Sequence, residues 1–123
     1  MIHSVFGDLY FNTGWKTDIE IVLFGKARRI TVKARSYAET DGLTAAQQAA
    51  LTDCQEHLEK RMKEAETLLS SYGDCAARFS PRTLLFGRDG EYALLCDDRD
   101  DPDDGIAVIL SPRQEIGSQD MYL

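Results

Sequence analysis

Apolar and polar residues alternate along two neighbouring stretches of the chain. Ile19, Ile21 and Leu23 occupy every second position of residues 18–24, which predicts a strand with one apolar face. Residues 28–37 repeat the pattern, with apolar side chains at positions 30, 32 and 34 and charged or hydroxyl side chains between them. Gly25 and Lys26 separate the two stretches. We therefore predict an antiparallel hairpin that has one solvated face.

The apolar spacing changes to three and four residues after position 44. Thr44 followed by Gln47 fits a capping box, which predicts the start of a helix. Gly73 suits the position just past its end. A helix of about 28 residues would be about 42 Å long, longer than the strands, so one end must overhang the sheet, kink or fray. One apolar stripe predicts a single amphipathic helix, through Leu51, Cys54, Leu58, Met62, Ala65, Leu69 and Tyr72.

Shorter apolar runs predict the remaining strands. Residues 2–11 are rich in strand formers and are interrupted at Gly7 and Asp8 by a turn or bulge. Asp89-Gly90 lies between apolar runs at 83–86 and 92–96, which predicts a second hairpin. Residues 74–81 read as a connector and 97–105 as a loop, and the wholly apolar residues 106–110 are typical of a central strand.

The order of these elements is β-β-β-α-β-β-β. It predicts an α+β fold, an antiparallel sheet of about five to six strands with one long amphipathic helix packed across it. The length of 123 residues suits a single domain over residues 1–123.

The excess of acidic residues indicates which kind of partner the chain can bind. The chain has 21 acidic and 14 basic residues, for a net charge of -7. Such a chain repels phosphate backbones, so we expect no nucleic-acid partner, and its field attracts a basic protein. No apolar run approaches the ~18 residues that a spanning helix needs, so we expect no membrane partner.

The cysteines and the N-terminus bear on the compartment. Cys54, Cys75 and Cys96 show neither a disulfide framework nor a zinc spacing. The first residues lack the pattern of a signal peptide. We expect a cytoplasmic protein with free thiols.

The sequence offers no catalytic constellation. His3 lies near the terminus, and His57 lies beside the apolar stripe of the helix without a second histidine at zinc-binding spacing. Cys54 belongs to the apolar stripe, and Cys96 precedes two aspartates that would raise its thiol pKa. Glycine-rich phosphate loops are missing. We predict neither an enzyme nor a cofactor.

The acidic segment at residues 97–104 admits three interpretations. Aspartates before a glycine suit calcium or magnesium, with Asp97, Asp98 and Asp100 as candidate ligands, although Pro102 and Ser111 occupy positions where an EF-hand needs acids. The second interpretation is a solvated loop, and the third is a docking surface for a basic partner. The residues predicted for that surface are Asp97, Asp98, Asp100, Asp101, Asp103 and Asp104, together with Glu56, Glu59, Glu64 and Glu66 of the helix.

One stretch of the chain is basic instead. The basic face of the predicted hairpin has two interpretations. It can contact an acidic ligand, or it can be a solvated face whose charge is offset by the acids of the helix or the aspartate loop. The second interpretation is the favoured one. The basic residues are Lys26, Arg28, Arg29, Lys33 and Arg35.

Several short motifs resemble a family of small, acidic bacterial proteins of unknown biochemical function. They span nearly the whole chain and include Phe6-Gly7-Asp8-Leu9, Gly14-Trp15, Leu23-Phe24-Gly25-Lys26, Asp89-Gly90-Glu91, Gly105-Ile106-Ala107-Val108 and Gln119-Asp120. Similar proteins occur among the immunity proteins of polymorphic and contact-dependent growth inhibition toxins of bacteria.

The resemblance implies a cytoplasmic inhibitor that binds a cognate toxin domain, and it does not identify the toxin. It transfers no binding residue. Such toxins often act on nucleic acid, so a basic substrate cleft suits an acidic inhibitor, and we expect a nuclease-type toxin domain whose active site this chain occludes. Two alternatives remain open at this point: an enzyme that uses the carboxylates of residues 97–104, with or without a metal ion, and a homo-oligomeric scaffold.

Overall fold

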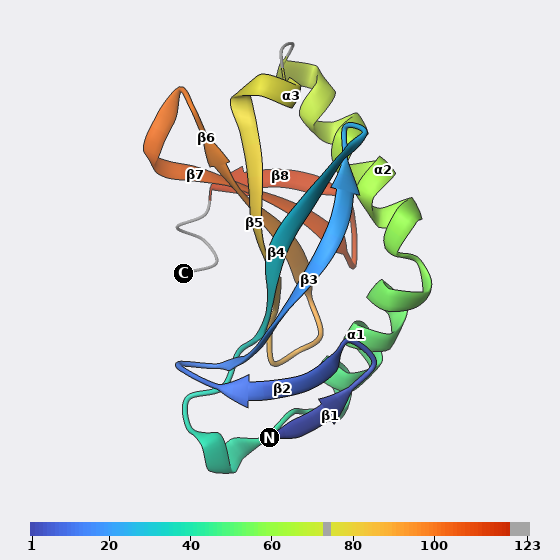
Figure 1. Cartoon of the computed structure of the whole chain (residues 1–123), viewed down its shortest axis with the longest axis vertical. Helices are drawn as coiled ribbons and strands as arrows, with labels where there is room; N and C mark the ends of the chain where they lie inside the picture. The colour runs from blue at the N-terminus through green and yellow to red at the C-terminus, as the bar shows by residue number, and fades with distance from the viewer. Residues whose placement is uncertain (73–74, 119–123) are drawn as a thin grey trace.

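Eight strands form one mixed sheet, in which every strand pairs with the next along the chain (Figure 1). This computed structural model describes residues 1–72 and 75–118, with the side chains of all of these except Tyr72, Cys75, Ala76, Pro102, Asp104 and Ser118. The strands are β1 (Ile2–Ser4), β2 (Gly7–Phe11), β3 (Trp15–Leu23), β4 (Lys26–Ala34), β5 (Phe79–Phe86), β6 (Tyr92–Asp98), β7 (Asp101–Ser111) and β8 (Glu115–Ser118). The helices are η1 (Glu39–Asp41), α1 (Ala45–Glu56), α2 (Leu58–Leu69), η2 (Ser70–Tyr72) and α3 (Cys75–Arg78).

The α+β class is confirmed, but the predicted count of five to six strands is wrong. The predicted strand at residues 2–11 is a hairpin, because β1 and β2 pair across a turn at Val5 and Phe6. The short strand β8 pairs with β7. Few apolar residues mark β1 or β8, since each covers only an edge of the sheet. The run at 106–110 belongs to β7, which is the seventh strand in the order and not a central one.

The hairpin of β3 and β4 is confirmed. Ile19 pairs with Ile30, and Leu23 pairs with Lys26 across a turn at Phe24 and Gly25, both of which have positive φ. Alternate residues of β4, including Val32, are buried against the helices, as the alternation predicts.

The prediction of a purely antiparallel sheet is wrong at one place. Strand β5 runs parallel to β4, with Thr31 beside Thr83 and Lys33 beside Leu85. The helices between the two strands return the chain to the end of the sheet where β4 began, so β5 runs in the same direction. All other neighbouring strands are antiparallel.

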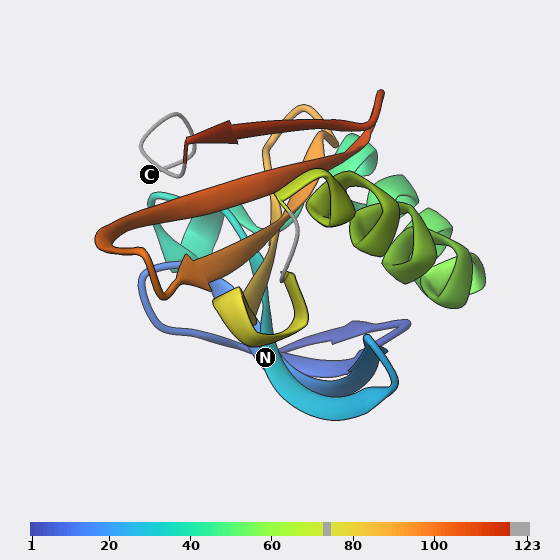
Figure 2. The ribbon, with the colours of Figure 1, turned by 90° about the horizontal axis from the view of Figure 1, so that it is seen from above.

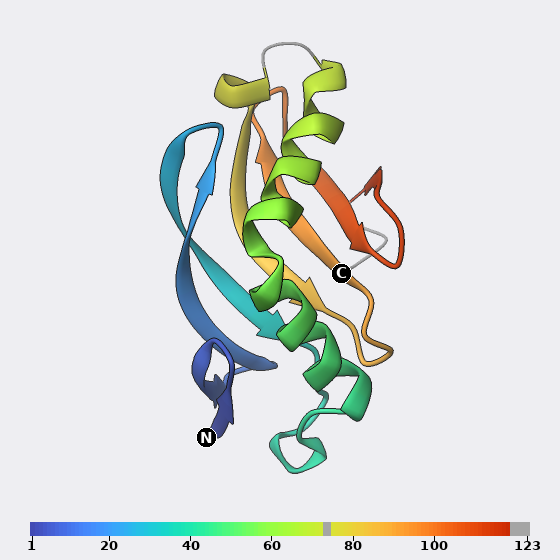
Figure 3. The ribbon, with the colours of Figure 1, turned by 90° about the vertical axis from the view of Figure 1, so that its right-hand side faces the viewer.

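The predicted single helix is two helices that meet at His57. The capping box is present, because Gln47 N donates to Thr44 Oγ1 at 3.0 Å and Thr44 N donates to Gln47 Oε1 at 3.0 Å. His57 has φ -119° and ψ 25°, outside the helical region, so the axis changes direction there. The break lets one apolar stripe follow a curved sheet, as Figure 3 shows for α1 and α2 across one face.

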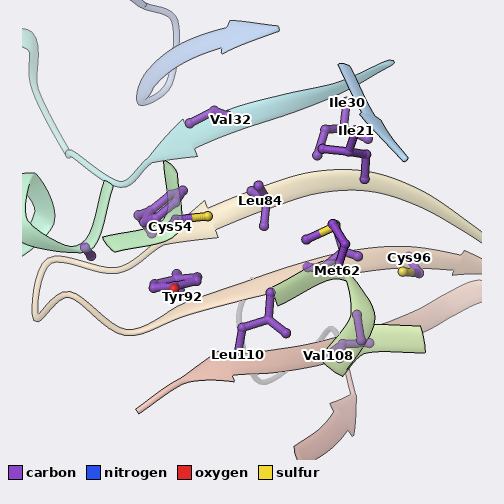
Figure 4. Packing of buried hydrophobic residues seen from close by; sticks show 14 of the residues in the cluster. Ile21, Ile30, Val32, Cys54, Met62, Leu84, Tyr92, Cys96, Val108 and Leu110 are labelled. Carbon is purple, nitrogen blue, oxygen red and sulfur yellow. The ribbon is translucent and has the colours of Figure 1, made fainter. Parts of the chain in front are cut away.

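The core lies between this helical layer and the inner face of the sheet. Figure 2 shows the sheet curving so that its two ends approach α2 from opposite sides. Cys54 and Met62 of the helices lie over buried residues of several strands, among them Leu84, Val108 and Leu110 (Figure 4). Because the helices cover the inner face, the neighbouring strand positions point to the outer face.

Candidate functional site

The acidic segment is not the loop that we predicted. Residues 97–98 end β6, Arg99 and Asp100 form a turn, and β7 begins at Asp101. Asp98 faces Asp101 in the register. The segment is thus the tip of a hairpin, which projects from the sheet in Figure 1. We call residues 97–103 the acidic tip. The side chain of Asp104 lies outside the described residues.

Asp98 is part of the fold and not of the surface. Its side chain is 4% exposed, and Arg78 donates to it through Nε at 2.8 Å and Nη2 at 3.0 Å. The backbone N–H of Asp100 donates to the same carboxylate at 3.0 Å. The bonds from Arg78 hold the pKa of Asp98 below its usual value against the cost of burial. Asp98 is therefore unsuited to the partner contact that we predicted for it.

The remaining carboxylates of the tip divide into two kinds. Asp97 pairs with Arg82 at 3.1 Å, and Asp100 lies 3.3 Å from Arg78. Asp101 and Asp103 are exposed, and within the described part of the chain no basic group is at ion-pair distance from either of them. These two side chains carry the negative charge that a partner would meet.

The acidic helix residues form a separate surface. Glu56 and Glu59 are exposed on either side of the helix break. Glu64 accepts from Arg61 at 3.2 Å, and Glu66 accepts from the backbone N–H of Phe24 at 3.1 Å, so both act within the fold. Figure 1 places the acidic tip across the molecule from α1 and α2, so the structure does not bring the two predicted acidic groups together.

A metal site at the tip receives no geometric support. Among the side chains that the structure describes, which exclude Cys75 and Asp104, no three His, Cys, Asp or Glu lie together as a ligand set. The predicted ligands Asp97, Asp98 and Asp100 are each bound to an arginine. A divalent ion would have to displace those cations.

A partly buried polar network joins the helix break to β6. The Tyr92 hydroxyl donates to Asp53 at 2.7 Å, and Arg61 donates to the Tyr92 oxygen at 2.9 Å and to Asp53 at 3.2 Å. The bond from Tyr92 lowers the pKa of Asp53, while burial raises the pKa of Tyr92. Every member has a partner, so the network is typical of a structural tether.

The two described thiols are not nucleophiles. Cys54 and Cys96 are both buried. Burial is the main cause that raises the pKa of each thiol to about 12. At neutral pH both are therefore protonated, as expected from the sequence for structural cysteines. The side chain of Cys75 lies outside the described residues.

A groove of about 870 Å³ lies on the outer face of the sheet. Apolar side chains of β5 and β6, Leu85 and Leu95, belong to its floor, and threonines and cations surround them. The polar lining residues include Thr13, Lys16, Thr31, Lys33, Arg35, Arg82, Thr83, Arg88, Asp89 and Glu91. We call this feature the cationic groove.

Two lysines and an arginine lie close together in the groove without a carboxylate partner among the described residues. Lys16 lies directly opposite Lys33 in the antiparallel register, and Arg35 comes two residues after Lys33, directly after the end of β4. No carboxylate of the described residues forms an ion pair with any of the three. Burial, followed by the charges of Lys16 and Arg35, lowers the pKa of Lys33. An anion would relieve this repulsion.

Local structure holds these side chains in place. A Cβ on Gly14 would lie 2.9 Å from Cε of Lys33, so the glycine leaves room for the lysine stem. Nη1 of Arg88 donates to the carbonyl of Arg35 at 3.1 Å, to that of Gly42 at 2.7 Å and to Gln47 Oε1 at 3.2 Å. Arg88 is therefore a structural clamp between the groove and α1.

Sequence reasoning found only part of this groove. Lys33 and Arg35 are among the basic residues of the predicted hairpin. The pattern favours a solvated face for that hairpin and not a binding site. Lys16, Arg82 and Arg88 were missed, because they are far apart in the sequence and only the register of β3, β4 and β5 brings them to one face. Lys26, Arg28 and Arg29 do not line the groove.

Comparisons with protein-family models, with curated proteins and with solved structures find no match for this chain. No helix of the described residues is long and apolar enough to cross a membrane.

Proposed function

We propose that this chain is a non-enzymatic binding protein, an immunity protein that neutralises a bacterial toxin domain of nuclease type in the cytoplasm. The observation that carries the proposal is the acidic tip, a projecting hairpin whose Asp101 and Asp103 are exposed and unpaired within the described residues. A nuclease cleft is basic because it binds phosphates. A narrow acidic hairpin suits insertion into such a cleft, where it would exclude the substrate.

The charge of the whole chain supports the same proposal. A net charge of -7 attracts a basic partner over a distance of about a Debye length and speeds the encounter. The pair of Arg78 and buried Asp98 anchors the base of the tip to α3. A preorganised tip loses little entropy on binding.

The experiment uses the product of the reading frame next to this one, which the proposal expects to be a toxin domain with nuclease activity. The purified chain is added in increasing amounts to that domain, and cleavage of nucleic acid is followed. We expect inhibition to be complete at one chain per toxin domain. Full cleavage in the presence of excess chain would contradict the proposal. Size-exclusion chromatography with light scattering separates it from the alternative of a homo-oligomeric scaffold, which predicts self-association of the chain alone.

A further inference from the structure

We propose that the cationic groove binds a small anion with two linked phosphate groups, at a site distinct from the acidic tip. The proposal stands on the convergence of Lys16, Lys33 and Arg35, which lie on one face of the sheet without a carboxylate partner among the described residues. This is unusual in a chain with an excess of seven negative charges. It goes beyond the proposed toxin inhibition and does not depend on it.

The strand register supports the binding of an anion at this place. Like charges directly opposite each other in an antiparallel pair destabilise a sheet. Lys16 and Lys33 occupy such a pair, and the lysine stem fits against Gly14. Asp18, two residues after Lys16 on β3, is held by Thr31 at 3.1 Å and by Arg29 at 3.8 Å. Asp18, the nearest acid of the same strand, therefore already has its own partners.

The donors around the groove are those that phosphate groups require. A guanidinium forms forked bonds to phosphate oxygens, and ammonium groups supply point charges. The hydroxyl of Thr83 lies on the same face, beside Thr31 in the parallel register. Each phosphate group brings a charge of about -1.5 to -2, so two groups balance three cations.

The surroundings limit the size of the ligand. Asp89 and Glu91 line the groove, and Asp97 pairs with Arg82 beside it. A long acidic peptide or a nucleic acid would meet these carboxylates as well as the net negative field of the chain. A groove of about 870 Å³ is within the usual range for small-molecule sites, roughly 300–1,000 Å³.

The test is calorimetric titration of the whole chain with pyrophosphate at pH 7 and low salt. We expect one site per chain. Lys16→Met and Lys33→Met should each weaken the affinity about tenfold, as expected for the loss of one charge-assisted contact. The control Lys26→Met removes the same charge from β4 outside the groove and should change the affinity by less than about twofold. Circular dichroism confirms that each variant is folded.

Three results would overturn the proposal. The first is no heat of binding, and the second is an equal loss in Lys26→Met, which would show that only net charge matters. The third is tighter binding of hexaglutamate or of a short oligonucleotide than of pyrophosphate, which would assign the groove to a macromolecule. Since the toxin is absent from this titration, the result is independent of the proposed inhibition.

Discussion

Lys16 of β3 lies directly opposite Lys33 of β4, in a strand pair that is otherwise regular from Trp15 to Leu23. The two ammonium groups repel each other, and the pKa of Lys33 is lowered by burial and by the charges of Lys16 and Arg35. A sheet that keeps this pair gives up some stability. The Lys16–Lys33 pair is therefore not required by the fold, and we attribute it to the binding of an anion.

Removing one charge of the pair should stabilise the protein. We expect Lys33→Met to raise the free energy of unfolding by about 0.2–1 kcal/mol at low salt, the usual scale of cross-strand pairs. The gain should shrink at high salt because screening weakens the repulsion. Urea unfolding at two salt concentrations measures it, with Lys26→Met, opposite Leu23, as the control. A loss of stability in Lys33→Met alone would mean that the lysine stem packs favourably enough to outweigh the repulsion.

The bidentate pair of Arg78 and Asp98 should make stability depend on pH. Asp98→Asn keeps the shape of the side chain but removes its charge, and we expect a loss of about 1.5–3 kcal/mol at pH 7. Asp98 has a lowered pKa in the folded chain, so its contribution is complete well above the unfolded value of about 3.9 and is lost as the pH falls toward the folded value. Urea unfolding of both proteins at several pH values should show the difference shrinking in acid. Equal differences at pH 7 and pH 3 would disagree with this assignment.

The hydroxyl of Tyr92 should stabilise the helix break through Asp53. Tyr92→Phe keeps the ring against Phe86 and leaves the ion pair of Arg61 and Asp53, so we expect a loss of about 1 kcal/mol. Thermal unfolding measures the change. Tyr10→Phe is the matched control, because Tyr10 is 60% exposed and should be neutral. A neutral Tyr92→Phe would show that the ion pair alone holds the break.

Gly90 should be intolerant of a side chain for two reasons. Its φ is +90°, and a Cβ there would lie 2.9 Å from the backbone oxygen of Ala46 at the start of α1. We expect Gly90→Ala to cost more than about 1 kcal/mol in stability. Gly25→Ala is the matched control, since Gly25 also has positive φ, +74°, but has nothing within 4 Å of the added atom. Equal losses in both variants would attribute the effect to backbone conformation alone.

The local elements of the fold were predictable and its assembly was not. Alternation at Ile19 and Ile30 identified the β3–β4 hairpin, and Thr44 with Gln47 identified the helix start. A kink was one of the three outcomes expected of a helix longer than the strands, but its place at His57 was not predictable, because the apolar stripe continues through it. The parallel pairing of β4 with β5 depends on where the helices return the chain, which no local pattern records.

The sequence predicted the carboxylates of the acidic tip but not the arginines that bind them. The cluster of aspartates was evident, but its arginine partners come from other elements, as Arg78 does for Asp98. The predicted loop is instead a pair of strands, in which Asp98 is buried and Asp97 and Asp100 are paired with arginines. The groove depends on Lys16 and Lys33 meeting across strands, which required the register.

The rate at which the chain associates with the proposed toxin domain tests the central proposal most directly. Stopped-flow or surface-based kinetics would compare the wild-type chain with Asp101→Asn/Asp103→Asn at the acidic tip, and with Glu56→Gln/Glu59→Gln on the helices as a control of equal charge. We predict that the wild-type rate falls steeply with salt and that the tip variant associates more slowly than the helix variant at low salt. Equal rates for the two variants, or a rate indifferent to salt, would contradict the account.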